Sequence, residues 1–324
     1  MFTLGGLKLD MPFFQAPLSG YSDHAMRILA RNYGSPLTFS PVMLDKISLH
    51  PKAAKKLIFH VYDNEHPVGA QILGSNPETM AKSAAAFESI GYDLIDLNFA
   101  CPAPKVLRRG RGGFLLQKPH TVMEIYRWVR QTVKCPVLMK LRAGFDKSQA
   151  AQEDFWEICE QAATENIEAL VIHARTVTQR YRGKADWQII SQLKQKFPNT
   201  KIIGSGDILT AETAIERLKK SNVDGILIAR GAIGNPWIFS ELRALWQGKP
   251  KPPEPSIAEQ GTVMLRHFEM ICQTRPTRKA IPYFRKFLAG YCKRHPQRKI
   301  VQAKLMASRN KEQLLTKIKK WYDI

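Results

Sequence analysis

The stretch LIDLNFACPAPKV, residues 94–106, decides how the rest of the chain is interpreted. Leu94, Ile95 and Leu97 form a short apolar run that is typical of a strand buried in a parallel sheet. Asn98 ends this run, and the thiol of Cys101 follows three residues later. Because α/β folds present functional groups where their strands end, the stretch predicts an active-site loop.

Seven further apolar runs alternate with amphipathic helical patterns, which predicts βαβ units and a parallel sheet. Eight strands fit a TIM (β/α)8 barrel. A doubly wound open sheet is the alternative, weakened by the lack of a Gly-x-Gly-x-x-Gly after the first strand. Residues 5–10 are expected to form a small strand or plug beneath the barrel. The expected strands are 13–18, 37–42, 68–73, 94–99, 137–142, 169–174, 201–206 and 225–230, and the helices are 77–90, 122–133, 150–165, 187–196 and 211–220.

The proline-rich segment QGKPKPPEP, residues 247–255, interrupts this alternation. Helical patterns follow at residues 256–272, 277–293 and 310–321. We therefore expect a barrel domain over residues 1–248 and a basic, small helical domain over residues 249–324.

Charge is the strongest compositional signal. The 324-residue chain carries a net charge of +21, and residues 249–324 hold 18 Lys/Arg against 5 Asp/Glu, a net +13. Such a concentrated excess predicts a partner with a phosphate backbone, and general solubility is the simpler alternative.

Other features point to a cytoplasmic protein. The chain has no apolar run long enough for a transmembrane helix and no basic leader followed by an apolar core, so neither membrane nor secretion is expected. Five cysteines without a C-x-x-C pair suit a reducing compartment, with neither a disulfide framework nor a metal site. A monomer is expected.

Polar residues follow most of the expected strands, at the edge where the active site of a barrel lies. At any single strand end, a polar residue with a purely structural role is the commoner explanation. A chance occurrence of polar residues at so many strand ends is much less common. The residues at these ends are Pro17, Ser19, Gln71, Asn98, Cys101, Lys140, Arg142, His173, Arg175, Ser205, Asp207 and Arg230.

Two glycine-rich strand ends predict a phosphate grip, namely Gly204-Ser205-Gly206-Asp207 and Ala229-Arg230-Gly231. A phosphate there, with three further polar residues around the barrel axis, suits FMN. Gln71 could pair with the pyrimidine half of the flavin ring, and Lys140 could stabilise the negative charge of a reduced flavin. His173 is expected beside them.

Cys101 admits three interpretations: an inert buried thiol, a nucleophile, or a general acid that protonates a carbon. Its position beyond a strand end disfavours the first. Residues 106–113, VLRRGRGG, are expected to form a mobile basic loop that closes over a substrate.

The motifs together resemble those of the flavin-dependent tRNA-dihydrouridine synthases over nearly the whole chain. NFACPAPKV at 98–106 is similar to the N-x-G-C-P-x-x-K-V signature of that family. Similar blocks are APLSGYSD at 16–23, QILG at 71–74, GGFLLQKP at 112–119, HART at 173–176 followed by Gln179, Tyr181, Gly183 and ADW at 185–187, GSGDI at 204–208, ARG at 229–231 and GNPW at 234–237.

The resemblance implies an NADPH-dependent flavoenzyme that reduces uridine in tRNA to 5,6-dihydrouridine. Hydride would reach C6 from the flavin while Cys101 protonates C5, and the target base would leave its stack to reach the site. Substrate-binding candidates near the base are Asn98, Arg142 and Arg175, and those for the RNA backbone are Arg285, Lys286, Lys293 and Arg294.

The chain departs from the family pattern at several positions, which puts the placement of the substrate in doubt. They are Ala100 for glycine, Ser205 for asparagine, Phe114 for a small residue, and Phe287 and Gly290 for His and Trp. Three other functions stay open: a synthase acting on ribosomal RNA, a flavoenzyme for a free pyrimidine like dihydroorotate dehydrogenase, and an RNA-binding protein without catalysis.

Overall fold

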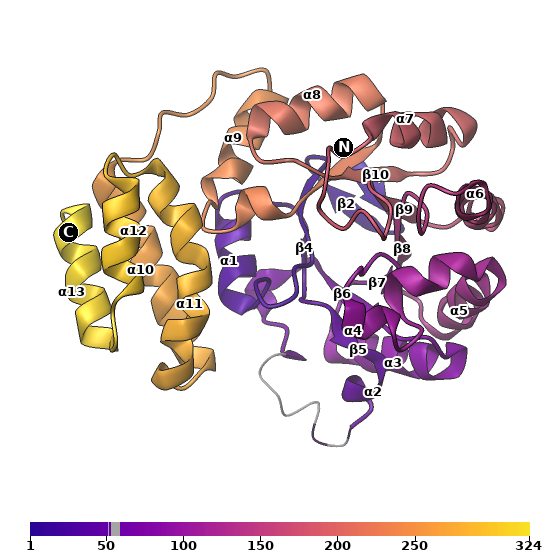
Figure 1. Cartoon of the computed structure of the whole chain (residues 1–324), viewed down its shortest axis with the longest axis horizontal. Helices are drawn as coiled ribbons and strands as arrows, with labels where there is room; N and C mark the ends of the chain where they lie inside the picture. Colours follow the sequence, from indigo (N-terminus) through magenta and orange to yellow (C-terminus); the bar gives the residue numbers. More distant parts are fainter. Residues whose placement is uncertain (51, 53–58) are drawn as a thin grey trace.

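The computed structural model describes residues 1–50, 52 and 59–324. Within them, eight parallel strands form a nearly closed barrel, in the order β3-β11-β10-β9-β8-β7-β6-β4 (Figure 1). The short β5 (Met43–Leu44) extends the pairing of β6. The barrel strands are β3 (Phe13–Gln15), β4 (Thr38–Phe39), β6 (Val68–Leu73), β7 (Leu94–Asn98), β8 (Val137–Arg142), β9 (Ala169–His173), β10 (Ile202–Ser205) and β11 (Gly225–Ile228).

The first strand lies between the last and the second, which nearly closes the barrel. β3 lies parallel to β11, with Phe14 opposite Leu227. On its other side, the Gln15 N–H donates to the Leu37 carbonyl at 3.1 Å, next to β4. An open doubly wound sheet leaves its edge strands unpaired, so that alternative is wrong and the TIM barrel is confirmed.

Helices follow the strands and cover the barrel from outside (Figure 1). Their starts are set by capping: the Asp23 carboxylate accepts from the Met26 N–H at 3.2 Å, and the Asn76 side chain accepts from the Thr79 N–H at 2.9 Å. The helices are α1 (His24–Asn32), α2 (Asp45–Ser48), α3 (Pro77–Ile90), α4 (Pro104–Leu107), α5 (Pro119–Thr132), α6 (Gln149–Thr164), α7 (Trp187–Lys196), α8 (Ala211–Ser221) and α9 (Trp237–Trp246).

Apolar residues fill the lower part of the barrel interior. Phe14, Leu94, Leu138 and Ile203 belong to one buried cluster there. The antiparallel strands β1 (Phe2–Leu4) and β2 (Leu7–Leu9) pack against the same cluster through Phe2, Leu4 and Leu9. The expected plug is therefore confirmed, and it shields the apolar end of the barrel from water.

A C-terminal helical region packs beside α1 and α9 (Figure 1). It consists of α10 (Ile257–Thr274), α11 (Thr277–Tyr291), α12 (Arg298–Met306) and α13 (Lys311–Tyr322). The sequence predicted three of these helices and missed α12. The expected boundary at 248/249 falls between α9 and α10 and stays a prediction.

Ion pairs connect the helical region to the barrel. Arg294 contacts Glu241 of α9 at 2.7 Å, and Arg275 contacts Asp23 at 2.9 Å. Because Asp23 also caps α1, its carboxylate binds both a barrel helix and Arg275 of the helical region.

No helix among the described residues is long and apolar enough to cross a membrane. The same part of the chain contains no group of three or more His, Cys, Asp or Glu side chains arranged to hold a metal ion.

Candidate active site

Strand alternation places polar side chains at the upper end of the barrel interior. In β7, Leu94 belongs to the inner apolar cluster while Ile95 packs outward against the helices. The two-residue period therefore turns Asp96 and Asn98 inward as well. The same alternation in β8 puts Lys140 and Arg142 above Leu138. The polar layer thus sits directly on the apolar one.

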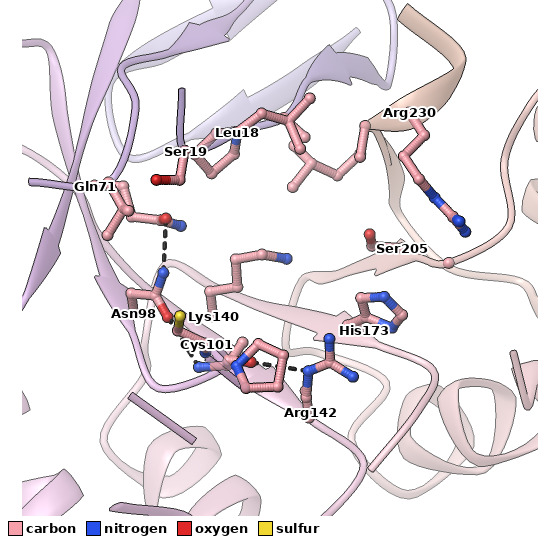
Figure 2. Close-up of a pocket in the computed structure, with 18 of the residues that line it drawn as sticks. Leu18, Ser19, Gln71, Asn98, Cys101, Lys140, Arg142, His173, Ser205 and Arg230 are labelled. Carbon is pink, nitrogen blue, oxygen red and sulfur yellow. Dashed lines mark hydrogen bonds between the residues drawn. The ribbon is translucent and has the colours of Figure 1, made fainter. Parts of the chain in front are cut away.

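This polar layer surrounds a cavity at the carboxyl ends of the strands. Most of the predicted site residues line it, and Figure 2 shows many of them pointing into the same space. The predicted residues in its wall are Pro17, Ser19, Gln71, Asn98, Cys101, Lys140, Arg142, His173, Ser205, Gly206, Asp207, Ala229 and Arg230.

Three predicted residues lie behind the cavity wall. A Cβ at Gly204 would overlap the Trp187 ring, and one at Gly231 would come within 2.7 Å of the Ile208 carbonyl oxygen, so both glycines permit close packing. Arg175 is 3% exposed and donates to the Gly183 carbonyl and the Asp207 carboxylate, each at 2.6 Å. Arg175 is therefore placed to support the cavity wall from behind.

The four candidates in the helical region lie outside the cavity. Arg285 donates to the Ser308 carbonyl at 2.7 Å, and Arg294 is bound to Asn235, Glu241 and Glu254. Those two arginines are used within the protein. Lys286 and Lys293 are exposed, and the Lys286 Nζ also donates to the Gly20 carbonyl at 3.1 Å.

The loop carrying Cys101 is held by hydrogen bonds from three directions. The Asn98 Oδ1 accepts from the backbone N–H groups of Ala100 and Cys101, at 3.0 Å each. The Arg142 Nε donates to the Ala100 carbonyl at 2.8 Å (Figure 2). The Gly113 N–H donates to the Cys101 carbonyl at 3.0 Å. The thiol therefore sits on an ordered loop at the cavity wall, and the segment expected to be a lid lies directly against it.

Lys140 lines the cavity, and Asp96 is buried below it. Burial lowers the pKa of Lys140 to about 8, an effect that Asp96 opposes and Arg142 reinforces. Burial raises the pKa of Asp96 to about 7, with Lys140 and the hydrogen bond from Gln71 acting against it. The Lys140 ammonium points into the cavity in Figure 2, where it can meet a bound anion.

His173 is a neutral imidazole. Burial, followed by the positive charge of Arg142 and Lys140, lowers the pKa of His173 to about 2. Among the described residues its Nδ1 atom is buried without a hydrogen-bond partner. A buried polar atom without a partner at a cavity wall is a ready contact for a polar ligand.

Asp207 organises the opposite side of the cavity. Its carboxylate contacts Arg175 at 2.6 Å and Arg230 at 2.9 Å. Although burial opposes it, hydrogen bonds from Ala185 and Arg175 hold the pKa of Asp207 below its ordinary value. Gly206, at φ +132°, and Asp207, at φ +54°, form the tight turn that aims this carboxylate at both guanidinium groups.

The residue-by-residue reasoning missed Tyr181, which lines the cavity and is 59% exposed. Its ring centroid lies 5.1 Å from the Arg230 guanidinium carbon and 5.8 Å from that of Arg142. Tyr181 follows no strand, so its place in the sequence indicates a site residue only through the family motif. Asp96 was missed too, although its two-residue spacing from Asn98 signals an inward side chain.

The chain is similar to known proteins over nearly its whole length. Residues 14–322 match the dihydrouridine synthase family. The chain is 35% identical over 290 residues to tRNA-dihydrouridine synthase B of Pasteurella multocida (strain Pm70), covering 89% of this chain and 86% of that protein. It is 30% identical over 293 residues to probable tRNA-dihydrouridine synthase 1 of Synechocystis sp. (strain ATCC 27184 / PCC 6803 / Kazusa), covering 90% and 81%.

Solved structures share the barrel at low sequence identity. Histamine dehydrogenase from Rhizobium sp. 4-9 superposes with a TM-score of 0.58 at 13% identity, over 83% of this chain and 50% of that one. Morphinone reductase superposes with a TM-score of 0.55 at 14% identity, over 78% and 91%. These similarities support the fold.

Barrel, cavity and sequence matches together define a flavin-dependent oxidoreductase. Within that class, the chain belongs to the dihydrouridine synthase family.

Proposed function

We propose that this protein reduces uridine in tRNA to 5,6-dihydrouridine, with FMN in the cavity and NADPH as the electron donor. The names of the relatives support tRNA over the ribosomal RNA and free-pyrimidine alternatives. The observation that carries the proposal is that Cys101 lines the same cavity as Gln71, Lys140 and His173.

The cavity fits a flavin mononucleotide by its unpaired polar groups. The buried His173 Nδ1 lacks a partner among the described residues, and the Lys140 ammonium points inward. Gln71 and these two residues would face the ring, while Arg230 and the Gly206 turn would hold the phosphate. The flavin would supply hydride to the uracil ring.

The chain itself supplies the acid and the positions. Cys101 would hold the proton that C5 of the uracil receives, which is a general-acid role. Asn98 and Arg142 fix the Cys101 loop through the hydrogen bonds described above, so the thiol is placed before the substrate arrives. The exposed Lys286 and Lys293 would contact the RNA backbone, and the remaining candidates Arg175, Arg285 and Arg294 would support these surfaces.

A dihydrouridine map of tRNA and ribosomal RNA, with and without this gene, tests the proposal. We expect loss of dihydrouridine at one or more tRNA positions, restored by the wild-type chain. Loss confined to ribosomal RNA would overturn the substrate. No loss in either RNA, with redundant enzymes removed, would favour a small-molecule flavoenzyme.

A further inference from the structure

Asp96 is a buried acid that the proposed reaction does not use. It projects inward from the middle of β7, below Asn98, and it is 0% exposed. Its Oδ1 atom has no hydrogen-bond partner among the described residues. Burying a carboxylate in a barrel interior is unfavourable unless it makes specific contacts, so its contacts need an explanation.

A chain of hydrogen bonds leads from Asp96 to the backbone of the Cys101 loop. The Gln71 Nε2 donates to the Asp96 Oδ2 at 2.7 Å. The Asn98 Nδ2 donates to the Gln71 Oε1 at 2.7 Å, a bond visible in Figure 2. The Asn98 Oδ1 then accepts from the N–H groups of Ala100 and Cys101. Gln71 and Asn98 therefore each donate one hydrogen bond through the side-chain nitrogen and accept through the side-chain oxygen.

The chain has one consistent direction. The Asp96 Oδ2 accepts from the Gln71 Nε2, so Gln71 turns its NH2 group toward Asp96. Its carbonyl then faces Asn98, which turns its own NH2 group toward Gln71. Only that orientation leaves the Asn98 oxygen facing the loop, where two backbone donors need an acceptor. Reversing Gln71 would set its NH2 group against that of Asn98, and reversing Asn98 as well would set donors against the two N–H groups of the loop.

The positive charge of Lys140 favours the ionised form of Asp96. Burial raises the pKa of Asp96 to about 7, and the nearby Lys140 charge opposes that rise. No ion pair joins the two residues directly within the described part of the chain. The hydrogen bond from Gln71 is therefore the direct side-chain contact that Asp96 makes among the described residues.

We propose that Asp96 is a positioning residue: as the terminal acceptor of the chain through Gln71 and Asn98, it holds the Cys101 loop in place. The importance of that loop for proton transfer rests on the proposed function. The hydrogen-bond pattern itself does not, so it can be tested without measuring activity.

Hydrogen exchange of the full-length protein as purified tests the role of Asp96 as an acceptor. Asp96→Leu removes the acceptor and the charge, and we expect about tenfold faster exchange of the Ala100 and Cys101 amides. Asp96→Asn removes the same charge but keeps an oxygen that can accept from Gln71. It should therefore retain most of the protection, as a conservative rescue.

Asp93→Leu is the matched control. Asp93 lies just before β7 and accepts from the Val68 N–H at 2.6 Å, at the opposite end of the barrel. This variant should accelerate exchange at Val68 and leave Ala100 and Cys101 as in the wild type. Unchanged exchange at Ala100 and Cys101 in Asp96→Leu would overturn the proposal. Equal acceleration in Asp96→Asn and Asp96→Leu would show a charge effect and overturn it too.

A measurement on the wild-type protein covers the case in which Asp96→Leu does not fold. The side-chain NH2 groups of Gln71 and Asn98 should each show a proton protected from solvent exchange by NMR. Rapid exchange of both groups would overturn the chain of hydrogen bonds. A protein that passes these tests but makes no dihydrouridine would refute the proposed function alone.

Discussion

Gly290 of α11 packs directly on the carbonyl of Ile233, at the junction between the helical region and the barrel. A Cβ at Gly290 would overlap that carbonyl oxygen and lie 3.0 Å from the Gly234 Cα. A Cβ at Gly234 would in turn lie 2.7 Å from the backbone N atom of Tyr291, the last residue of the same helix. The two segments therefore approach backbone to backbone, which any side chain at these positions prevents.

We expect Gly290→Ala to lower the free energy of unfolding by about 1–3 kcal/mol, because α11 must move away from Ile233. Hydrogen exchange should also accelerate in α11. Gly6→Ala is the control, since a Cβ at Gly6 meets nothing within 4 Å. Equal stability of Gly290→Ala and wild type in denaturant unfolding would contradict the packing argument.

Gly290 also shows where sequence reasoning stops. The departure from the family's tryptophan was visible in the sequence, but only the folded chain shows that the position lies against Ile233. The barrel strands were predictable because most of them are short, mainly apolar runs that alternate with amphipathic helical patterns. Helix α12 was missed because only Val301 and Leu305 are buried in it, which leaves a weak periodic signal.

Site residues could be predicted from the sequence where they lie at the ends of predicted strands. Strand ends gather at one edge of a barrel, so Gln71, Lys140 and His173 could be grouped without knowing their contacts. The sequence could not show which charged residues face a ligand and which are paired within the protein. Arg175 and Arg294 look like free cations in the sequence, while their partners come from distant segments.

Cys101→Ala should retain bound flavin and its reduction by NADPH but lose about 10²–10⁴-fold in dihydrouridine formation, the usual contribution of a general acid. Flavin absorbance and single-turnover product formation measure the two steps separately. Cys135→Ala, at another half-buried thiol, serves as the control. Undiminished product formation by Cys101→Ala would remove this thiol from the acid role.

FMN binding should weaken above about pH 8, where Lys140 loses its charge in the folded protein. The expected fall is about tenfold in affinity per pH unit if the ammonium contacts the ligand. Lys140→Met should bind more weakly and show little of this dependence. Titrations of the flavin-free protein by fluorescence from about pH 7 to about pH 9.5 compare the two across this titration range. If FMN affinity fell equally with pH in the wild type and in Lys140→Met, Lys140 would not be the group whose charge contacts the ligand.

The lowered pKa of His173 predicts how the free energy of unfolding depends on pH. The unfolded chain takes up a proton at this histidine near pH 6.5, whereas the folded protein, with a pKa of about 2 there, does not. The free energy of unfolding should therefore fall as the pH drops below about 6.5, by up to about 1.4 kcal/mol per pH unit from this group. His173→Gln should show a shallower fall between about pH 6.5 and about pH 5 in urea unfolding, and an unchanged slope would contradict a neutral His173.

RNA binding should depend on Lys286 and Lys293 more than on the arginines beside them. The Lys286 Nζ lies 3.1 Å from the Gly20 carbonyl, in the loop that includes cavity residues Pro17 and Ser19, so a phosphate there would be close to the cavity mouth. The Lys286 Nζ also donates to that carbonyl, but Lys286 is exposed, whereas Arg285 and Arg294 are half-buried and donate within the protein. Removal of the arginines would therefore mix folding with binding more than removal of the lysines.

Changing Lys286 and Lys293 to Ala together should weaken tRNA binding and lower the slope of log affinity against log salt by about 1–2, one unit for each lost phosphate contact. The pair Lys219→Ala and Lys220→Ala, on the exposed side of α8, removes the same charge from the barrel and should leave the slope unchanged. Filter binding from low to moderate salt measures both. Equal slopes in the two double variants would mean that net charge alone attracts the RNA, and the contact surface would then have to lie elsewhere.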